Sequence, residues 1–317
     1  MSTRLRIASR PSKLALLQAE LIKNEILAIE PQLEVAIVAI KTTGDRLTRG
    51  SLADVGGKGL FVRELEQALV TAEADIAVHS MKDLPAALPD QYRIAAVPSR
   101  DNPSDVIVSR RAGIESLQPS ALVGTASPRR KFELLDARPD LRIELLRGNI
   151  DTRLSRLAAG EFDAIVLAAA GLKRMGVLST PPSGFLIEEL SEDRFVPAAG
   201  QGALAIEALV DGPIAASSEI EALVTGLDQD QARCETSAER SFLATIGASC
   251  NSPVGAHAEL TPDRLLLRAV LFSFDGRRKI RDTASARISD HTDATKLGVA
   301  LAKQMLAAGA GDLMRSA

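Results

Sequence analysis

The chain has 317 residues, and 38 basic against 41 acidic side chains give it a formal charge of −3. This length suits about two or three domains with real hydrophobic cores, and 46% apolar with 25% charged residues excludes disordered and fibrous proteins. No apolar run approaches the roughly 18 residues of a membrane span. Two cysteines and three histidines, without metal-binding spacing, predict neither a disulfide framework nor a metal site, and they indicate a reducing, cytoplasmic location.

Strands and helices alternate through the first two-thirds of the chain. Strands are expected at residues 5–9, 33–40, 75–79, 105–109, 121–124, 142–147, 164–168 and 202–209, and helices near 12–29, 61–72, 128–138 and 150–159. Such alternation predicts parallel or mixed sheets covered by helices. Glycine-rich residues 54–59 and Pro/Ser-rich residues 179–184 are expected to be loops.

The pattern changes after about residue 221. Helices are expected near 221–228 and 230–245, followed by strands at 254–260, 264–274 and 279–286 and a last helix near 293–308. Asp275-Gly276 is a hairpin turn signal between the second and third of these strands. This part therefore predicts a small α+β domain with a three-stranded meander.

Four loops that follow predicted strands carry an unusual share of polar side chains. They lie at residues 10–12, 79–83, 125–130 and 147–153. Sites in open α/β sheets form at the carboxyl ends of strands, and the helix N-termini found there favour anions. A solvated charge cluster is the alternative for each loop alone, but four loops at the same kind of transition favour an anion site.

Arginine dominates the positive charge, with 28 Arg against 10 Lys. The planar guanidinium binds carboxylate or phosphate in bidentate fashion, so the bias is typical of anion handling, although a genomic composition bias is the alternative. Net negative charge and only nine aromatic residues disfavour a nucleic-acid binder. Residues 55–59, Val-Gly-Gly-Lys-Gly, have neither Walker A nor Rossmann spacing.

Two side chains are candidates for chemistry. Asp83, next to Lys82 after a strand, can hold an N–H group or move a proton, whereas a loop-capping aspartate is the alternative. Cys250, between a helix and a strand, is a candidate nucleophile or attachment point, whereas an inert small residue is the alternative. For His79 we favour a core histidine with its hydrogen bonds satisfied, and for Cys234 an inert cysteine on a helix.

The same segments resemble the porphobilinogen deaminase (hydroxymethylbilane synthase) family almost from end to end. The matching segments are residues 6–10 (Arg-Ile-Ala-Ser-Arg), 55–61, 75–83, 146–149 (Leu-Arg-Gly-Asn), 170–174, 197–202 (Pro-Ala-Ala-Gly-Gln-Gly) and 238–240. A chance match to one of them is plausible, and to all of them in order and spacing it is not.

The resemblance implies a transferase of porphyrin and heme biosynthesis. It would condense four porphobilinogen molecules head to tail, with release of ammonia, into the linear tetrapyrrole hydroxymethylbilane. The chain would grow on a covalent dipyrromethane cofactor, one per chain, held by a thioether to Cys250. Asp83 matches the family's catalytic aspartate, which stabilises the cation left when ammonia departs.

The resemblance also implies two sets of binding residues and a lid. Cofactor binding would involve Lys82, Asp83, Thr125, Ser127, Arg129, Arg130 and Arg147, besides Cys250. Substrate binding would involve Arg10, Ser12, Arg147, Arg153, Arg174 and Gln201. Lys58 and Phe61 would belong to a mobile lid loop. Bidentate pairs of arginine with carboxylate suit this task, because every pyrrole carries two carboxylates.

The implied fold is two periplasmic-binding-protein-like α/β domains plus a small C-terminal α+β domain with a three-stranded sheet. Domain 1 would comprise residues 1–100 and 197–220, domain 2 residues 101–196, and domain 3, with the cofactor cysteine, residues 221–317. The family also implies a monomer, without nucleic-acid or membrane partners, whose product passes to uroporphyrinogen-III synthase.

This sequence departs from the family at two loops. Ala248 and Ser249 stand before Cys250 where glycines are common, and Asn251 follows where Gln is common. Ala126 replaces a hydroxyl residue and removes one contact. The thiol is retained, so attachment is still expected. A non-catalytic two-lobed anion-binding protein is the rival hypothesis, since a fold does not fix a function.

Overall fold

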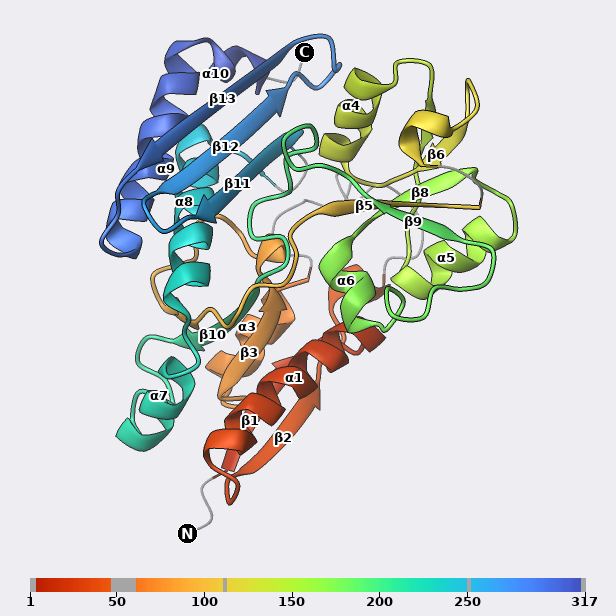
Figure 1. Cartoon of the computed structure of the whole chain (residues 1–317). Coiled ribbons are helices and arrows are strands. Elements are labelled where there is room, and N and C mark those ends of the chain that lie inside the picture. Colours follow the sequence, from red (N-terminus) through yellow and green to blue (C-terminus); the bar gives the residue numbers. More distant parts are fainter. Residues whose placement is uncertain (1–3, 47–60, 111–112, 250–251, 315–317) are drawn as a thin grey trace.

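The computed structural model describes residues 4–46, 61–110, 113–249 and 252–314, which build three sheets with their covering helices (Figure 1). The first sheet has the order β2-β1-β3-β10-β4. Its strands are β1 (Arg4–Ser9), β2 (Glu34–Ala39), β3 (Ile76–Ser80), β4 (Tyr92–Ala96) and β10 (Leu204–Leu209). β1 is parallel to β2 and β3, whereas β10 is antiparallel to both of its neighbours. We call this sheet and its helices lobe 1.

Helices cover both faces of the lobe 1 sheet. They are α1 (Lys13–Ile29), the short α2 (Thr43–Arg46), α3 (Arg63–Val70) and α7 (Ser218–Thr225). Ile22 and Ile26 of α1 pack against Ile7 of β1, all of them fully buried, while Leu65 of α3 lies in a separate cluster with Ala8. Adjacent β1 residues therefore point to opposite, apolar faces, as in a sheet buried on both sides.

The second sheet, in lobe 2, has the order β7-β6-β8-β5-β9. Its strands are β5 (Asp105–Ser109), β6 (Leu122–Gly124), β7 (Arg142–Glu144), β8 (Ala164–Ala168) and β9 (Leu186–Glu189). The helices are α4 (Pro128–Ala137), α5 (Ile150–Ala158) and α6 (Ala169–Arg174), with 3-10 turns at Met81–Asp83 in lobe 1 and Ile114–Ser116 in lobe 2. As in lobe 1, three parallel strands are followed by one strand antiparallel to both neighbours.

The C-terminal unit is a meander of β11 (Val254–Leu260), β12 (Leu265–Phe272) and β13 (Lys279–Ala286) with helices α8 (Asp230–Ile246), α9 (His291–Ala307) and α10 (Ala310–Leu313). α8 and α9 pack so closely that a Cβ on Gly298 would lie 2.1 Å from the Ala238 carbonyl oxygen. The other side of the sheet meets lobe 2, where the rings of Phe132 and Phe272 are 5.9 Å apart.

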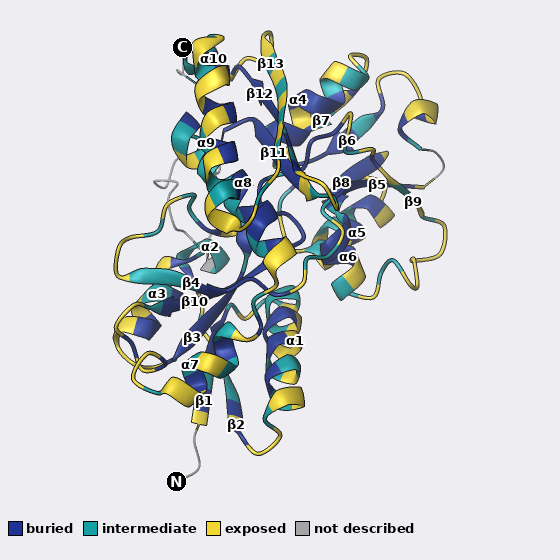
Figure 2. Ribbon diagram, turned by 60° about the vertical axis from the view of Figure 1, so that its left-hand side comes forward, coloured by how far each residue is buried: buried dark blue, intermediate teal, exposed yellow. Residues whose placement is uncertain are grey.

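Two segments connect the lobes and run beside the C-terminal unit. We call residues 97–104 the first crossover and residues 190–203 the second crossover (Figure 1). Figure 2 shows buried residues concentrated on the central strands and exposed residues on the outer sides of the helices. Within the described part of the chain, no helix is long and apolar enough to cross a membrane.

The expected fold class, two α/β domains and a small α+β domain with a three-stranded sheet, is confirmed. The strands expected at 105–109, 164–168, 254–260 and 279–286 have the expected limits. The strand expected at 142–147 is wrong at its end, because its partner β6 is only three residues long and β7 ends with it at Glu144. β4, β9 and α6 have no counterpart among the predicted elements.

The expected domain limits stay a prediction, which the return of β10 to the lobe 1 sheet supports. The predicted glycine-rich loop at 54–59 lies outside the described residues.

Candidate active site

The polar loops lie where strands of both lobes end. Arg10 and Ser12 follow β1, and Ser12 caps α1 by accepting a hydrogen bond from Ala15 N at 3.3 Å. In lobe 2, Thr125 and Ser127 follow β6, and Ser127 caps α4 by accepting from Arg130 N at 3.4 Å. Thr125 Oγ1 in turn accepts from Ser127 N at 3.1 Å. The caps fix the start of each helix.

The two lobes meet at these loops. A Cβ on Gly171 of α6 would lie 3.1 Å from Ile150 Cδ1 and 3.8 Å from Leu14 Cδ2. Leu14 is in the first turn of α1, and Ile150 is the first residue of α5. The N-terminal turns of α1 and α5, from different lobes, therefore lie close together, and helix N-termini favour negative charge nearby.

Gln201, a buried residue of the second crossover, joins side chains from the two lobes. Its Oε1 accepts hydrogen bonds from Lys82 Nζ at 3.1 Å and from Arg130 Nη2 at 3.3 Å. Its Nε2 donates to Asp105 Oδ1 at 2.8 Å and to the Pro103 carbonyl oxygen at 2.6 Å. The substrate-binding residue expected at 201 thus lies at the centre of this cluster, with its own amide bonded to the protein.

Asp105, at the start of β5, is the anion inside this cluster. Its side chain is buried, with Arg130 Nη2 at 2.7 Å from Oδ1 and Arg129 Nη2 at 2.8 Å from Oδ2. Burial by itself would raise the pKa of Asp105, but Arg129 and Arg130 outweigh it and hold that pKa well below its usual range. Asp105 therefore stays ionised and orients both arginines.

Arg129 is enclosed by protein groups. Besides Asp105, its guanidinium contacts Glu133 Oε2 at 2.7 Å and the Val196 carbonyl oxygen at 2.9 Å. Burial raises the pKa of Glu133 to about 7 although Arg129 opposes the shift. Arg130 keeps more access to the site, since its side chain is 9% exposed against 4% for Arg129.

Asp83 lies in the 3-10 turn Met81–Asp83 and is exposed. Within the described part of the chain, it makes no hydrogen bond or ion pair, yet its charge reaches across the lobes. Burial and then Arg130 lower the pKa of Arg153 to about 10, and Asp83 opposes this shift. In the same way, burial and then Arg130 lower the pKa of Lys82 to about 8, against Asp83 and Asp105. The charge of this accessible carboxylate thus acts on Lys82 beside it and on Arg153 of lobe 2.

Arg10 and Arg174 have carboxylate partners of their own. Arg10 binds Asp45 through Nη2 at 2.5 Å, and its guanidinium lies 4.1 Å from the centre of the Phe61 ring. Arg174 contacts Asp101 at 2.9 Å and donates to the Gly202 carbonyl oxygen at 2.6 Å. Arg153 donates from Nε to the Gly148 carbonyl oxygen at 2.7 Å.

The remaining expected site residues are only partly described. Arg147 is half-buried after β7. Cys250 and Lys58 lie outside the described residues, whereas Phe61, the other residue of the expected lid loop, is described and half-buried. His79 is a buried residue of β3 whose Nε2 lies 2.9 Å from Glu207, in line with the core interpretation. Burial raises the pKa of the Cys234 thiol on α8, as expected of an inert cysteine.

The sequence analysis missed the carboxylates that hold the arginines. Asp45, Asp101, Asp105 and Glu133 each contact at least one of them. The only signal was an acid at the start of the apolar strand Asp105–Ser109, since a buried carboxylate needs a partner. No group of His, Cys, Asp and Glu in the described ranges could hold a metal ion.

Comparison with known proteins places the chain in a family. A family model described as "Porphobilinogen deaminase, dipyromethane cofactor binding domain" matches residues 5–215, and the C-terminal domain model of the same family matches residues 233–307. The chain belongs to the porphobilinogen deaminase family. It carries the family's dipyrromethane cofactor binding domain, and we assign it to the hydroxymethylbilane synthases, the enzymes of this family in tetrapyrrole and heme biosynthesis.

Curated members of the family align over nearly the whole chain. The porphobilinogen deaminase of Nitratidesulfovibrio vulgaris (strain Miyazaki F) is 42% identical over 314 residues, which cover 98% of this chain and 96% of that protein. The porphobilinogen deaminase of Brevibacillus brevis is 43% identical over 311 residues, which cover 98% of this chain and 96% of that protein.

Among solved structures, the chain is similar to a Salmonella typhimurium periplasmic binding protein of high arginine specificity. The TM-score is 0.40 at 14% identity, over 71% of this chain and 93% of that one.

Proposed function

We propose that this chain condenses four porphobilinogen molecules head to tail, with release of one ammonia from each, into linear hydroxymethylbilane. The observation that carries the proposal is the cluster in which Lys82 of lobe 1 and Arg130 of lobe 2 share Gln201, with exposed Asp83 next to Lys82. Porphobilinogen brings two carboxylates and a pyrrole N–H, and this arrangement offers cations for the former and a carboxylate for the latter.

The cations fit the carboxylates of a dipyrromethane and of the growing chain. Lys82 donates one N–H to Gln201, which leaves its other ammonium protons for a ligand. Arg130 is held in place by Asp105, so little side-chain entropy is lost when it binds an anion. Thr125, Ser127, Arg147 and Arg129 complete the proposed cofactor set, and Arg10, Ser12, Arg153, Arg174 and Gln201 the substrate set. Among the arginines of these sets, Arg129 is the most enclosed by the protein itself.

Asp83 is the proposed catalytic residue. Loss of ammonia from porphobilinogen leaves a cation, and a fixed carboxylate stabilises that charge as it develops. Asp83 also accepts the pyrrole N–H and so orients the ring. Its exposure in the structure leaves both carboxylate oxygens accessible to a substrate.

Cys250 is the proposed attachment point of the cofactor, through a thioether. When bound, the dipyrromethane supplies the pyrrole terminus on which the chain is extended. Cys250 stands in the sequence between α8 and β11, in the C-terminal unit. We further propose a cytoplasmic monomer that passes its product to uroporphyrinogen-III synthase.

The intact mass of the purified protein tests the proposal. We expect the wild type to exceed its sequence mass by one dipyrromethane, and Cys250→Ser to show the bare mass and no consumption of porphobilinogen. Cys234→Ser is the matched control, because Cys234 is buried on α8, and it should keep the added mass. A wild type that is unmodified and fails to consume porphobilinogen would contradict the proposed function.

A second comparison tests the anion site. Arg147→Leu should impair cofactor assembly or chain growth, because it removes a positive charge from the proposed cleft. Arg277→Leu, in the hairpin between β12 and β13 where the side chain is 86% exposed, should change neither. Single-turnover assays and intact masses measure the difference, and equal activities of the two variants would remove the argument for an anion cleft.

A further inference from the structure

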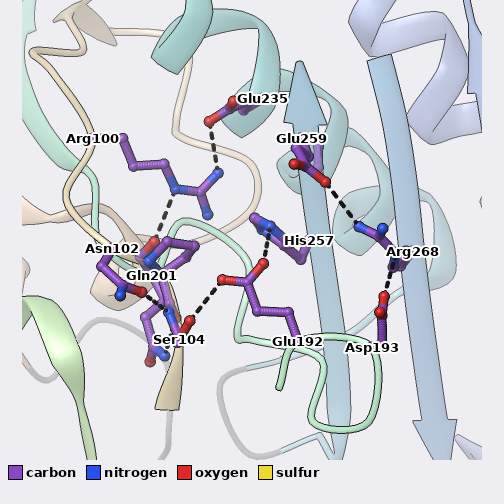
Figure 3. Close-up of polar contacts among 12 residues, drawn as sticks. Arg100, Asn102, Ser104, Glu192, Asp193, Gln201, Glu235, His257, Glu259 and Arg268 are labelled. Carbon is purple, nitrogen blue, oxygen red and sulfur yellow. Dashed lines mark hydrogen bonds and ion pairs between the residues drawn. The ribbon is translucent and has the colours of Figure 1, made fainter. Parts of the chain in front are cut away.

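Both crossovers are bound to one helix of the C-terminal unit. Arg100 of the first crossover contacts Glu239 Oε1 of α8 at 2.8 Å. It also contacts Glu235 Oε2 of the same helix at 3.3 Å (Figure 3). The backbone N of Gly200, in the second crossover, donates to Glu239 Oε2. The fully buried Glu239 carboxylate therefore holds both connections between the lobes at once.

His257 of β11 makes two further contacts at the same junction. Its Nε2 lies 2.9 Å from Glu192 Oε2 in the second crossover (Figure 3). Its Nδ1 lies 3.3 Å from Glu239 Oε1, at ion-pair distance but without the geometry of a hydrogen bond. Glu192 also accepts a hydrogen bond from Ser104 Oγ of the first crossover at 2.7 Å. Because each ring nitrogen lies within ion-pair distance of a carboxylate, the ring is favoured at this position as an imidazolium, with a proton on each nitrogen.

The backbone of β11 also contacts the second crossover. Ala256 N donates to the Pro197 carbonyl oxygen at 2.9 Å, and a Cβ on Gly255 would lie 2.5 Å from the Val196 carbonyl oxygen. Arg268 of β12, the residue paired with His257 in the sheet, contacts Asp193 at 3.2 Å. Two successive acids of the second crossover thus meet two cations of the C-terminal sheet, one buried and one near the surface.

The charges around His257 come from every element packed against it. They are Glu235 and Glu239 of α8, Glu192 and Asp193 of the second crossover, Arg100 of the first crossover, Glu259 of β11 and Arg268 of β12. Burial opposes protonation of the ring, but Glu192 and Glu239 outweigh it and raise the pKa of His257 to about 9.

We propose that His257 is a positioning residue that, as an imidazolium, holds the second crossover to α8 and so fixes the C-terminal unit against the two lobes. A neutral imidazole can donate to only one of the two carboxylates, so loss of the proton leaves Glu192 or Glu239 facing an acceptor nitrogen. The docking stands on the contacts alone, and its consequence for turnover rests on the proposed function.

The proposal fixes the pH range in which the junction weakens. The folded protein holds the His257 proton more tightly than the unfolded chain does, because its pKa of about 9 exceeds the ordinary value of 6.5. The stabilisation is therefore complete below pH 6.5 and is lost as the pH rises through 9.

Hydrogen exchange and thermal unfolding of His257→Gln test the proposal. Near neutral pH, amides of residues 190–203 should exchange about tenfold faster than in the wild type, because the local opening of the second crossover is favoured. The unfolding midpoint of the wild type should fall between about pH 7 and 10, and that step should be absent from His257→Gln. His291→Gln, exposed at the start of α9, is the control and should match the wild type in both measurements.

Glu192→Gln is the second variant, since its partly exposed side chain can be changed without burying a new group. It should also speed exchange at residues 190–203 and shrink the alkaline step. Unchanged exchange in both variants, or an alkaline step that persists in His257→Gln, would overturn the proposal. The measurements need no turnover, so a wild type without a dipyrromethane would contradict the proposed function and leave this result standing.

Discussion

Asp83→Asn is expected to lower kcat for porphobilinogen by about 10²–10³-fold, the usual cost of removing one group that stabilises charge in a transition state. The amide keeps the shape of the side chain but cannot balance the positive charge that develops as ammonia departs. The fold should be unaffected, because the side chain is exposed and makes no hydrogen bond or ion pair with other described residues.

Steady-state release of ammonia and thermal unfolding measure these two effects separately. Asp90→Asn is the matched control, because Asp90 is an exposed aspartate of the same lobe, before β4. It should keep both kcat and the unfolding midpoint. Turnover of Asp83→Asn within a few-fold of the control would remove the catalytic role of Asp83.

Asp105→Asn is expected to lower the free energy of unfolding by about 3–5 kcal/mol, the range for breaking a buried ion pair by removing one partner. The amide can accept one hydrogen bond but leaves Arg129 and Arg130 without their shared anion. Because these arginines hold the pKa of Asp105 below its usual range, its contribution is present above the ordinary carboxyl pKa and is lost as the pH falls. The variant should therefore lose part of the wild-type sensitivity to acid.

Urea unfolding at neutral and at acid pH measures this effect. The control is Asp136→Asn, which breaks an exposed pair with Lys279 whose side chains are 44% and 50% exposed. An exposed pair contributes about 0–1 kcal/mol, so this variant should unfold almost as the wild type does. A loss no larger in Asp105→Asn than in the control would show that Asp105 does not organise the arginines.

The second prediction depends on a general property of the site, which is that its cations are held by carboxylates of the protein before any ligand arrives. Asp105 holds Arg130, Asp45 holds Arg10 and Asp101 holds Arg174. Fixed side chains bind anions at a lower entropic cost than mobile ones, and the paired acids limit the repulsion among the cations.

Local patterns in the sequence predicted most of the strands and helices. The apolar strand Ala164–Ala168 and the helix starts near residues 12 and 128 depend on neighbours within a few positions, so they could be predicted directly. β4 and β9 could not, because their identity as strands depends on distant partners, β10 and β5. The candidate site followed the same division: the loop arginines were visible in the sequence, and the carboxylates that hold them were not.

The sequence by itself determined the alternation of strands and helices, the polar loops at strand ends and the family motifs that carry Asp83 and Cys250, because each is written in contiguous residues. Only the tertiary structure decided which charges meet. Arg129 and Asp105 stand 24 positions apart, and Arg100 and Glu239 stand 139 apart, so nothing local relates them. A buried charge needs its partner in space, and the packing of the two lobes and the C-terminal unit selects that partner. For this reason Arg129, to which the resemblance gave a role in binding the cofactor, is found held between two carboxylates of the protein itself.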